Sequence, residues 1–353
     1  MTSHLAVLSL VLLYFSSTSN AYAQEALKVT VVGRVVDDST GALLPLTNIF
    51  ISNSTIGTAA DSSGKFVLRG VPIGNQEVVA SIVGYKPETV TLKLADSTTQ
   101  VVTFRLKASP VQLQEVEVEA KDPVEWRKNL DRFTKAFIGS STHSPGCSLV
   151  NPQILDFSYE EHAGKLVATA RAPLEIENRA LGYHITCNLL LFIAVGDGLQ
   201  FIYLNAFRLL QPNHTMESEQ WTFNRRNAYF GSKRHFLISL IKNRVKQEGF
   251  EVFSVQRDGV QTALRRPAGF EVEVGGILGQ GETPFERKLR SEDLLQVVYT
   301  NGVSKQYSVF ELKGGSQVIF ANGLSANPLG LRMYGYWSMQ RVAELLPIDY
   351  EPE

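Results

Sequence analysis

The stretch DSSGKFVLRGVPIG at residues 61–74 decides the fold of the N-terminal region. An Asp-Ser-Ser-Gly turn sequence leads into a short strand-like run, and a second turn follows around Pro72 and Gly74. On both sides of this stretch, runs rich in Val, Ile and Thr recur between turn residues at a spacing of roughly eight to twelve positions. This spacing is typical of an all-β sandwich, and we expect about seven strands and no helix between residues 28 and 107.

The strand predictions follow the β-branched runs, which stand at residues 29–36, 47–52, 65–68, 78–83, 89–94 and 101–106. Gly41, Gly64 and Gly74 occupy turn positions that favour a positive φ. We expect Phe66 and Tyr85 to fill the core between the two sheets. These residues therefore serve the architecture of the sandwich.

Three aspartates lie in the turns of this region. Asp61 can cap its own turn through a side-chain oxygen. A calcium site formed by Asp37, Asp38 and Asp61 at one end of the sandwich is an alternative, although ordinary hairpin turns explain the same residues.

Four short motifs resemble a known family: Gly33-Arg34-Val35-Val36-Asp37, Asp61-x-x-Gly64-x-Phe66, Val71-Pro72-x-Gly74 and Ser81-x-x-Gly84-Tyr85. They are similar to the carboxypeptidase regulatory-like domain, a transthyretin-like β-sandwich of seven strands. The resemblance covers residues 28–107 and implies an accessory module of bacterial envelope proteins. It implies no catalysis by the module itself.

The N-terminus has the layout of a secretory signal peptide over residues 1–23. Residues 5–15 are apolar, and Ala21-Tyr22-Ala23 places small residues before a cleavage site at Gln24. We therefore expect export to the periplasm, to an outer-membrane-associated position or to the cell surface. The longest later apolar run, residues 189–195, is too short for a transmembrane helix.

Charge and cysteine content restrict the function classes further. Lys and Arg total 34 against 35 Asp and Glu, so the net charge of −1 provides no general attraction for nucleic acid. The two cysteines, Cys147 and Cys187, can form a disulfide in an oxidising compartment or remain two separate buried thiols.

Residues 108–121 form a linker that we expect to contain one more strand, at the alternating residues 115–119. Residues 122–353 are predicted to form a strand-rich α+β domain of unknown function, so that the protein as a whole is mainly β. A helix is expected to begin at Asp122-Pro123 and to end at Gly139, with an apolar stripe from Trp126 to Phe137. Further strands are expected at residues 154–159, 166–170, 181–192, 199–206, 249–255, 294–299, 305–312 and 317–320. Asn301-Gly302 and Gly314-Gly315 are expected to form hairpin turns.

The search for catalytic chemistry gives one partial motif. His214-x-x-Glu217 matches the short part of a metallocarboxypeptidase zinc site, which also requires a distant histidine, and only His235 lies beyond it. A solvated loop around His214 explains the motif better. We predict no catalytic residue, no metal ligand and no cofactor.

A helix predicted over roughly residues 219–246 carries the candidate binding residues. If it is continuous, Arg226, Lys233 and Arg244 project along its apolar stripe, together with Tyr229. Buried cations must extend to water, pair with a carboxylate of the chain or bind an anionic ligand. These four residues are therefore candidates for binding an anion or a partner.

The sequence thus predicts an exported, non-enzymatic binding or scaffolding protein of the bacterial cell envelope. Its partner would be an envelope protein or a glycan. The alternative is a hydrolase, metallocarboxypeptidase-like or acting on glycans, with an active site that no motif reveals. The sequence assigns no oligomeric state.

Overall fold

A computed structural model describes residues 27–109, 123–196 and 198–352. The predicted signal peptide, the strand at residues 115–119 and the helix cap at Asp122 lie outside the described residues.

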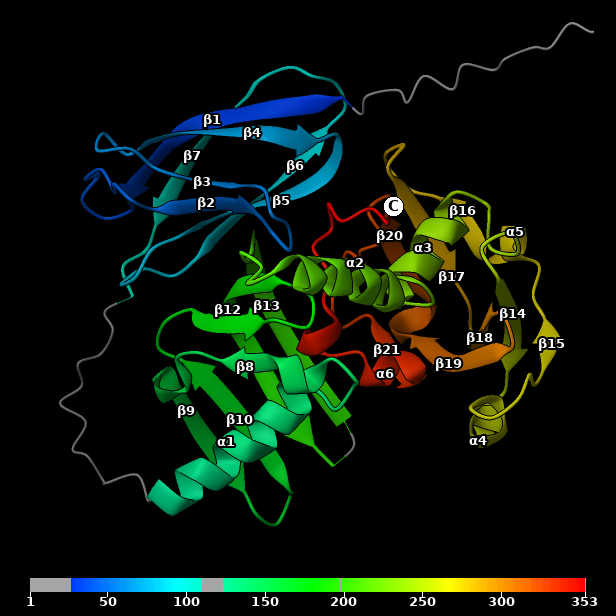
Figure 1. The fold of residues 1–353 in the computed structure, drawn as a ribbon. Coiled ribbons are helices and arrows are strands. Elements are labelled where there is room, and N and C mark those ends of the chain that lie inside the picture. The colour runs from blue at the N-terminus through cyan, green and yellow to red at the C-terminus, as the bar shows by residue number, and fades with distance from the viewer. Residues whose placement is uncertain (1–26, 110–122, 197, 353) are drawn as a thin grey trace, which may run out of the picture.

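Two sheets form the N-terminal sandwich, as the sequence predicts (Figure 1). Its strands are β1 (Lys28–Asp37), β2 (Asn48–Ile51), β3 (Gly57–Ala59), β4 (Lys65–Pro72), β5 (Gly74–Ser81), β6 (Glu88–Leu94) and β7 (Gln100–Leu106). One sheet has the order β4-β1-β7, with β1 parallel to β7, and the other has the order β3-β2-β5-β6. Alternating side chains of both sheets meet in one apolar core, which includes Val31, Phe66 and Phe104.

The turns of the sandwich follow their expected chemistry. Gly41, Gly64 and Gly74 all have positive φ. Asp61 Oδ1 accepts hydrogen bonds from the backbone N–H groups of Ser63 and Lys65 at 2.8 and 3.0 Å. Asp61 is therefore a turn cap, as predicted.

Phe66 and Tyr85 both contribute to the sandwich core, Phe66 fully buried and Tyr85 partly. The Tyr85 hydroxyl donates to Asp37 Oδ2 at 2.9 Å, while Asp37 Oδ1 accepts from the backbone of Ser39 and Thr40. Both oxygens of Asp37 are thus used within the sandwich, which favours the turn interpretation over the calcium alternative.

The α+β region begins with the predicted first helix and a sheet on which this helix packs. The elements are α1 (Pro123–Phe137), β8 (Cys147–Leu149), β9 (Leu155–Glu160), β10 (Lys165–Ala170), β11 (Leu174–Asn178), β12 (Tyr183–Val195) and β13 (Gly198–Leu209). The sheet has the order β8-β11-β12-β10-β9, and β13 also pairs with β12. Helix α1 packs on this sheet through Phe133 and Phe137, and Phe192 of β12 lies 4.6 Å from Phe133 between ring centroids.

The possible disulfide does not form. Cys147 lies opposite Asn178 at one end of β11, whereas Cys187 lies opposite Leu174 at its other end. Four residues of strand correspond to about 13 Å, which exceeds the Cα separation that a disulfide allows. Both cysteines are free and buried, and burial raises the pKa of the Cys147 thiol to about 12.

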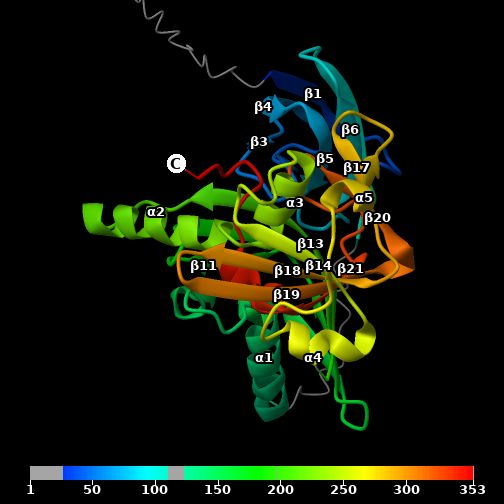
Figure 2. The same cartoon turned by 90° about the vertical axis from the view of Figure 1, so that its right-hand side faces the viewer.

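The remaining chain forms two further sheets and several short helices (Figure 2). A five-stranded sheet has the order β15-β14-β18-β19-β21, and a three-stranded sheet has the order β16-β17-β20. The elements are α2 (Thr215–Tyr229), α3 (Lys233–Ile241), β14 (Phe250–Val255), α4 (Val260–Ala263), β15 (Phe270–Glu271), α5 (Val274–Ile277), β16 (Leu278–Gln280), β17 (Glu286–Arg290), β18 (Leu294–Asn301), β19 (Ser304–Leu312), β20 (Ser316–Phe320), β21 (Leu331–Gly335) and α6 (Tyr336–Met339). Short 3₁₀ turns stand at Ser144–Gly146, Pro152–Ile154, Arg257–Gly259, Lys313–Gly315 and Val342–Glu344. Within the described residues, no helix combines the length and the apolar character that spanning a membrane requires.

One assumption and one local prediction in this part are wrong. The helical region predicted over roughly residues 219–246 is present as α2 and α3, but it is not the continuous helix that the binding stripe requires. Gly231, whose φ is +80°, breaks it, and Ser232 caps α3 by accepting from the backbone N–H of His235. Gly314-Gly315 does not close a hairpin, because β19 and β20 belong to different sheets. By contrast, Asn301-Gly302 does join the antiparallel strands β18 and β19.

The sandwich packs directly on the α+β region. Asn53 donates its backbone N–H to the Asn205 carbonyl at 2.7 Å, and Phe207 donates to the Ser54 carbonyl at 2.8 Å. Phe50 and Val79 of the sandwich also form an apolar cluster with Leu204 of β13. The residues after β2 thereby extend the edge of the β13 sheet.

Two buried side-chain hydrogen bonds cross the same junction. Asn75 donates to Glu286 Oε1 at 2.5 Å, and Ser81 donates to Asn188 Oδ1 at 2.9 Å. Burial alone would raise the pKa of Glu286, but the hydrogen bonds from Asn75 and from the Glu282 backbone outweigh it and lower that pKa. Glu286 therefore stays ionised within the junction at neutral pH.

Candidate functional site

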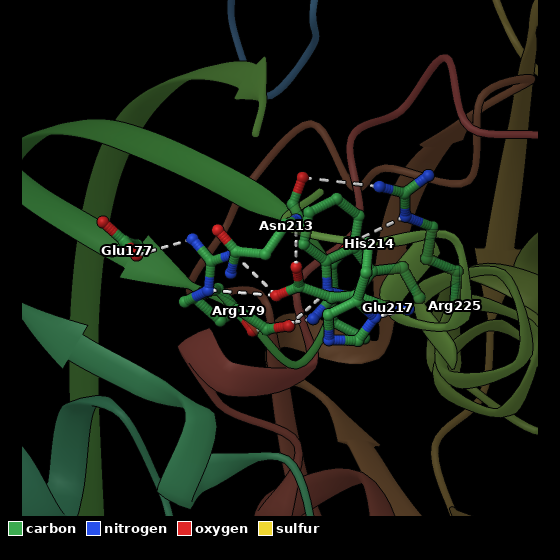
Figure 3. Close-up of polar contacts among 10 residues, drawn as sticks. Glu177, Arg179, Asn213, His214, Glu217 and Arg225 are labelled. Carbon is green, nitrogen blue, oxygen red and sulfur yellow. Dashed lines mark hydrogen bonds and ion pairs between the residues drawn. The ribbon is translucent and has the colours of Figure 1, made fainter. Parts of the chain in front are cut away.

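The partial zinc motif caps a helix (Figure 3). His214 is the N-cap of α2, and its Nδ1 accepts the backbone N–H of Glu217 at 3.2 Å. Glu217 Oε1 accepts from Arg179 at 2.6 Å, and Glu217 Oε2 accepts the backbone N–H of Asn213 at 2.6 Å. Both residues of the motif thus fix the start of α2, and the described residues contain no group of three His, Cys, Asp or Glu side chains that could hold a metal ion.

Three further hydrogen bonds anchor α2 on the turn between β11 and β12. Trp221 donates its indole N–H to the Arg179 carbonyl, Asn224 donates to the Ala180 carbonyl, and Arg225 donates to the Leu181 carbonyl. Gly182 has a φ of +71°, and a Cβ there would stand 2.3 Å from the Trp221 ring. The turn and one face of α2 are therefore closely fitted to each other.

The four predicted binding residues do not form one site. Arg226 is exposed near the end of α2, while Lys233 is half-buried at the start of α3. Arg244 is exposed beyond α3 and pairs with Glu248 at 3.1 Å. The break at Gly231 separates the directions of the two helices, so the stripe that the continuous helix predicted does not exist.

Tyr229, the fourth candidate, is buried in an aromatic group around His235. The His235 ring lies between Tyr229, Phe230 and Phe250, at centroid distances of 5.1, 5.2 and 4.8 Å. Its Nδ1 accepts the backbone N–H of Gly231, and burial lowers its pKa even though Glu248 stands 3.4 Å from Nε2. These contacts hold the α2–α3 junction in place, and the His235 side chain is buried among them.

Arg234 connects this junction to the C-terminal segment. Its guanidinium donates to the backbone carbonyls of Asn322, Ile348 and Tyr350. Asp349 accepts from the backbone and side chain of Thr55, and Ile348 donates its N–H to the Asn53 carbonyl. The C-terminal segment therefore joins the sandwich, helix α3 and the loop at Asn322.

A shallow basic hollow on the three-stranded sheet is a candidate for ligand binding. Its volume is about 350 Å³, and it is lined by Lys288, Arg290, Ser291, Glu292, Gly314, Gly315 and Ser316. Lys288 and Arg290 alternate on β17 and so project from the same face of that strand. Among the described residues, neither cation forms an ion pair with a carboxylate.

The floor of the hollow depends on its glycines. Ser291 donates its backbone N–H to the Gly315 carbonyl at 3.0 Å, which holds the two sides together. Gly315 has a φ of +70°, and a Cβ there would stand 2.8 Å from Glu292 Oε1. Two cations and one carboxylate therefore surround an open space that suits a small oxyanion.

Sequence reasoning missed this site because its two sides are distant along the chain and meet only through the pairing of β17 with β20. The available signals were the Lys-Leu-Arg alternation at residues 288–290 and the double glycine at 314–315. The first was not assigned to a strand, and the second was interpreted as a hairpin turn.

Comparison with known proteins identifies the N-terminal region. Residues 31–118 match the CarboxypepD_reg-like domain family, which confirms the resemblance that the sequence motifs showed. No curated protein matches the chain.

Three similar solved structures each match about a quarter of the chain. The Streptococcal ancillary pilin matches with 14% identity and a TM-score of 0.20, covering 24% of this chain and 33% of the pilin. The 3-chlorocatechol 1,2-dioxygenase of Rhodococcus opacus 1CP matches with 12% identity and a TM-score of 0.21, covering 25% and 63%. The shaft pilin SpaA of Lactobacillus rhamnosus GG matches with 18% identity and a TM-score of 0.19, covering 23% and 48%. The chain spans less than two thirds of each of these structures, and TM-scores this low carry no argument about function.

Proposed function

We propose that this chain, with its CarboxypepD_reg-like domain, is an exported, non-enzymatic scaffold of the bacterial cell envelope that binds an anionic group in the basic hollow. The domain family and the signal-peptide layout of residues 1–23 support the location. The sandwich is held in a fixed position on the α+β region, because hydrogen bonds of both backbone and side chains cross their junction.

The observation that carries the proposal is the pair of cations in the hollow. A guanidinium and an ammonium group that face the same space bind carboxylate, sulfate or phosphate oxygens through charge-assisted hydrogen bonds. Glu292 at the rim disfavours dense negative charge, so the site fits a single oxyanion on a larger envelope glycan or protein.

The competing hydrolase needs a nucleophile, a general base or a bound metal beside a cleft. In the hollow, the Ser291 hydroxyl donates to the Asp293 carbonyl, and no histidine lines the space. No observation on the described residues therefore favours hydrolysis over binding.

Calorimetric titration of the purified chain tests the proposal with three polysaccharides: polygalacturonate for carboxylates, dextran sulfate for sulfates and plain dextran as the neutral control. We expect one anionic polymer to bind and plain dextran not to bind. The double variant Lys288→Ala/Arg290→Ala should weaken binding about 10- to 100-fold, because it removes two charged donors.

The matched control is Arg69→Ala/Lys107→Ala, which removes the same charge from exposed positions of the sandwich. This control should bind within about twofold of the natural chain at physiological salt, because screening limits long-range effects. Equal loss in both double variants would contradict a local site. Turnover of either polymer would support the hydrolase instead.

A further inference from the structure

Helix α2 presents large apolar side chains to solvent on the face opposite its anchor. Met216 is 76% exposed and Phe223 is 59% exposed. The helix projects beyond the rest of the molecule in the view of Figure 2. Met216 and Phe223 lie two helical turns apart on the outer face of α2, so both can contact the same partner surface.

The exposed face is a continuous stripe. At 100° per residue from Met216, Gln220, Phe223 and Asn227 lie within about 40° of it, and all four residues are exposed. The buried face, with Trp221 and Arg225, lies on the opposite side and is fixed to the β11–β12 turn. The stripe is therefore held in a defined orientation.

We propose that the outer face of α2 packs antiparallel against the same face of a second copy of this chain. The proposal is independent of the ligand of the basic hollow, because different elements form the two surfaces. The four residues of the stripe follow one another at intervals of four, three and four residues. In an antiparallel pair, this spacing places Gln220 of one copy beside Phe223 of the other.

Charge complementarity identifies the second copy as the occupant. Glu219 and Arg226 are both exposed and lie on the same flank of the stripe, seven residues apart. In an antiparallel helix pair, residues on the same flank face each other, so the register that joins Gln220 to Phe223 also joins Glu219 to Arg226 of the second copy. The two-fold axis repeats this ion pair on the same flank, toward the other end of the helix pair.

Arg226 can make this contact in addition to those within its own chain. Its guanidinium lies 5.8 Å from the Phe230 ring centroid and has a further contact within the chain, and the side chain is exposed. A guanidinium has five N–H donors, so a carboxylate of the second copy can bind while these contacts remain.

The interface is small, and this sets the expected affinity. One helix pair buries less area than the 1,200–2,000 Å² that is typical of stable complexes, so the dimer should be in rapid exchange and dependent on concentration. Sedimentation equilibrium of the purified chain, from about 5 µM to about 1 mM, should show a reversible shift from monomer to dimer.

Phe223→Glu should weaken the dimer by about 30-fold or more, because it places two carboxylates at the centre of the interface. The matched control is Phe270→Glu, which changes a side chain that is 85% exposed on β15 and should leave association unchanged. A natural chain that stays monomeric over the whole range would overturn the proposal, as would a Phe223→Glu chain that associates like the control.

A charge exchange tests the antiparallel register. Glu219→Arg and Arg226→Glu should each weaken self-association about fivefold, since each places like charges opposite each other twice. An equimolar mixture of the two variants should restore it, because each chain then meets the opposite charges of the other. If the mixture associates no more strongly than either variant alone, the register is overturned. The same variant chains are compared alone and mixed, so a lower stability of one variant does not by itself produce a gain in association on mixing.

Discussion

The junction of the sandwich and the basic hollow use polar side chains in opposite ways. At the junction, Asn75 and Glu286 bind each other inside the protein. In the hollow, Lys288 and Arg290 lie on the same strand as Glu286 but have no carboxylate partner among the described residues. Polar groups that bind each other inside the protein fix the structure, whereas those that face solvent remain available for a ligand. Substitutions at the two places should therefore differ in what they affect.

The largest effect on stability is expected at Arg234. Arg234→Ala breaks three hydrogen bonds to backbone carbonyls, including those of Ile348 and Tyr350. We expect a loss of about 3 kcal/mol in the free energy of unfolding, measured by urea denaturation. Hydrogen exchange should quicken at residues 347–352 and at the sandwich residues 53–55, which the C-terminal segment contacts.

The control for this change is Arg244→Ala. Arg244 is an exposed arginine whose ion pair with Glu248 lies on the surface, and it should contribute less than about 0.5 kcal/mol. Similar losses in both variants would mean that the contacts of Arg234 with the C-terminal segment do not stabilise the protein.

A smaller loss is expected at the junction itself. In the natural chain, Glu286 accepts hydrogen bonds from Asn75 and from the backbone N–H of Glu282. Glu286→Gln keeps one acceptor oxygen for Asn75, but its amide N–H₂ group cannot accept the backbone N–H of Glu282. We expect a loss of about 1–2 kcal/mol, with the sandwich exchanging amide protons faster than the sheet around β12. A uniform change over the whole chain would place the effect outside the junction.

Acid should weaken the same contact. The pKa of Glu286 in the folded protein lies below its ordinary value of 4.5, so the folded state holds the carboxylate more favourably than the unfolded chain does. This contribution is complete above that ordinary value and is lost as the pH falls through the folded pKa. Between pH 6 and about pH 3, Glu286→Gln should therefore lose less stability than the natural chain, as measured by thermal unfolding across the pH series.

The sandwich was predictable because its signals are local. Alternation, glycine turns and the Asp61 cap all act within a few residues, and the structure contains each of them. The break between α2 and α3 depends on distant contacts as well. Gly231 and Ser232 mark it in the sequence, but the Trp337 indole N–H that binds the Gly231 carbonyl comes from far along the chain. Periodicity alone could not separate one long helix from two.

The stripe that was expected to join the candidate binding residues is absent for the same reason. Arg226, Lys233 and Arg244 share a stripe only on an unbroken helix, whereas the cations that do share a space are on β17. The pairing of β17 with β20, which brings Arg290 opposite Ser316, follows from sheet topology and not from a motif. The sequence therefore identified the charged and turn-forming residues, but it could not predict which of them lie side by side in the fold.

The smallest effect on stability is expected in the hollow, whose residues lie on the same strand as the junction residue Glu286 and can be compared with it directly. Lys288→Ala and Arg290→Ala each remove a cation that binds no carboxylate within the described residues, so each should change the free energy of unfolding by less than about 0.5 kcal/mol. Urea denaturation, with Glu286→Gln as the reference on the same strand, measures the difference. A loss as large as that of Glu286→Gln would mean that the hollow serves the fold. A near-zero loss with weakened anion binding is the result that a binding site on a stable scaffold requires.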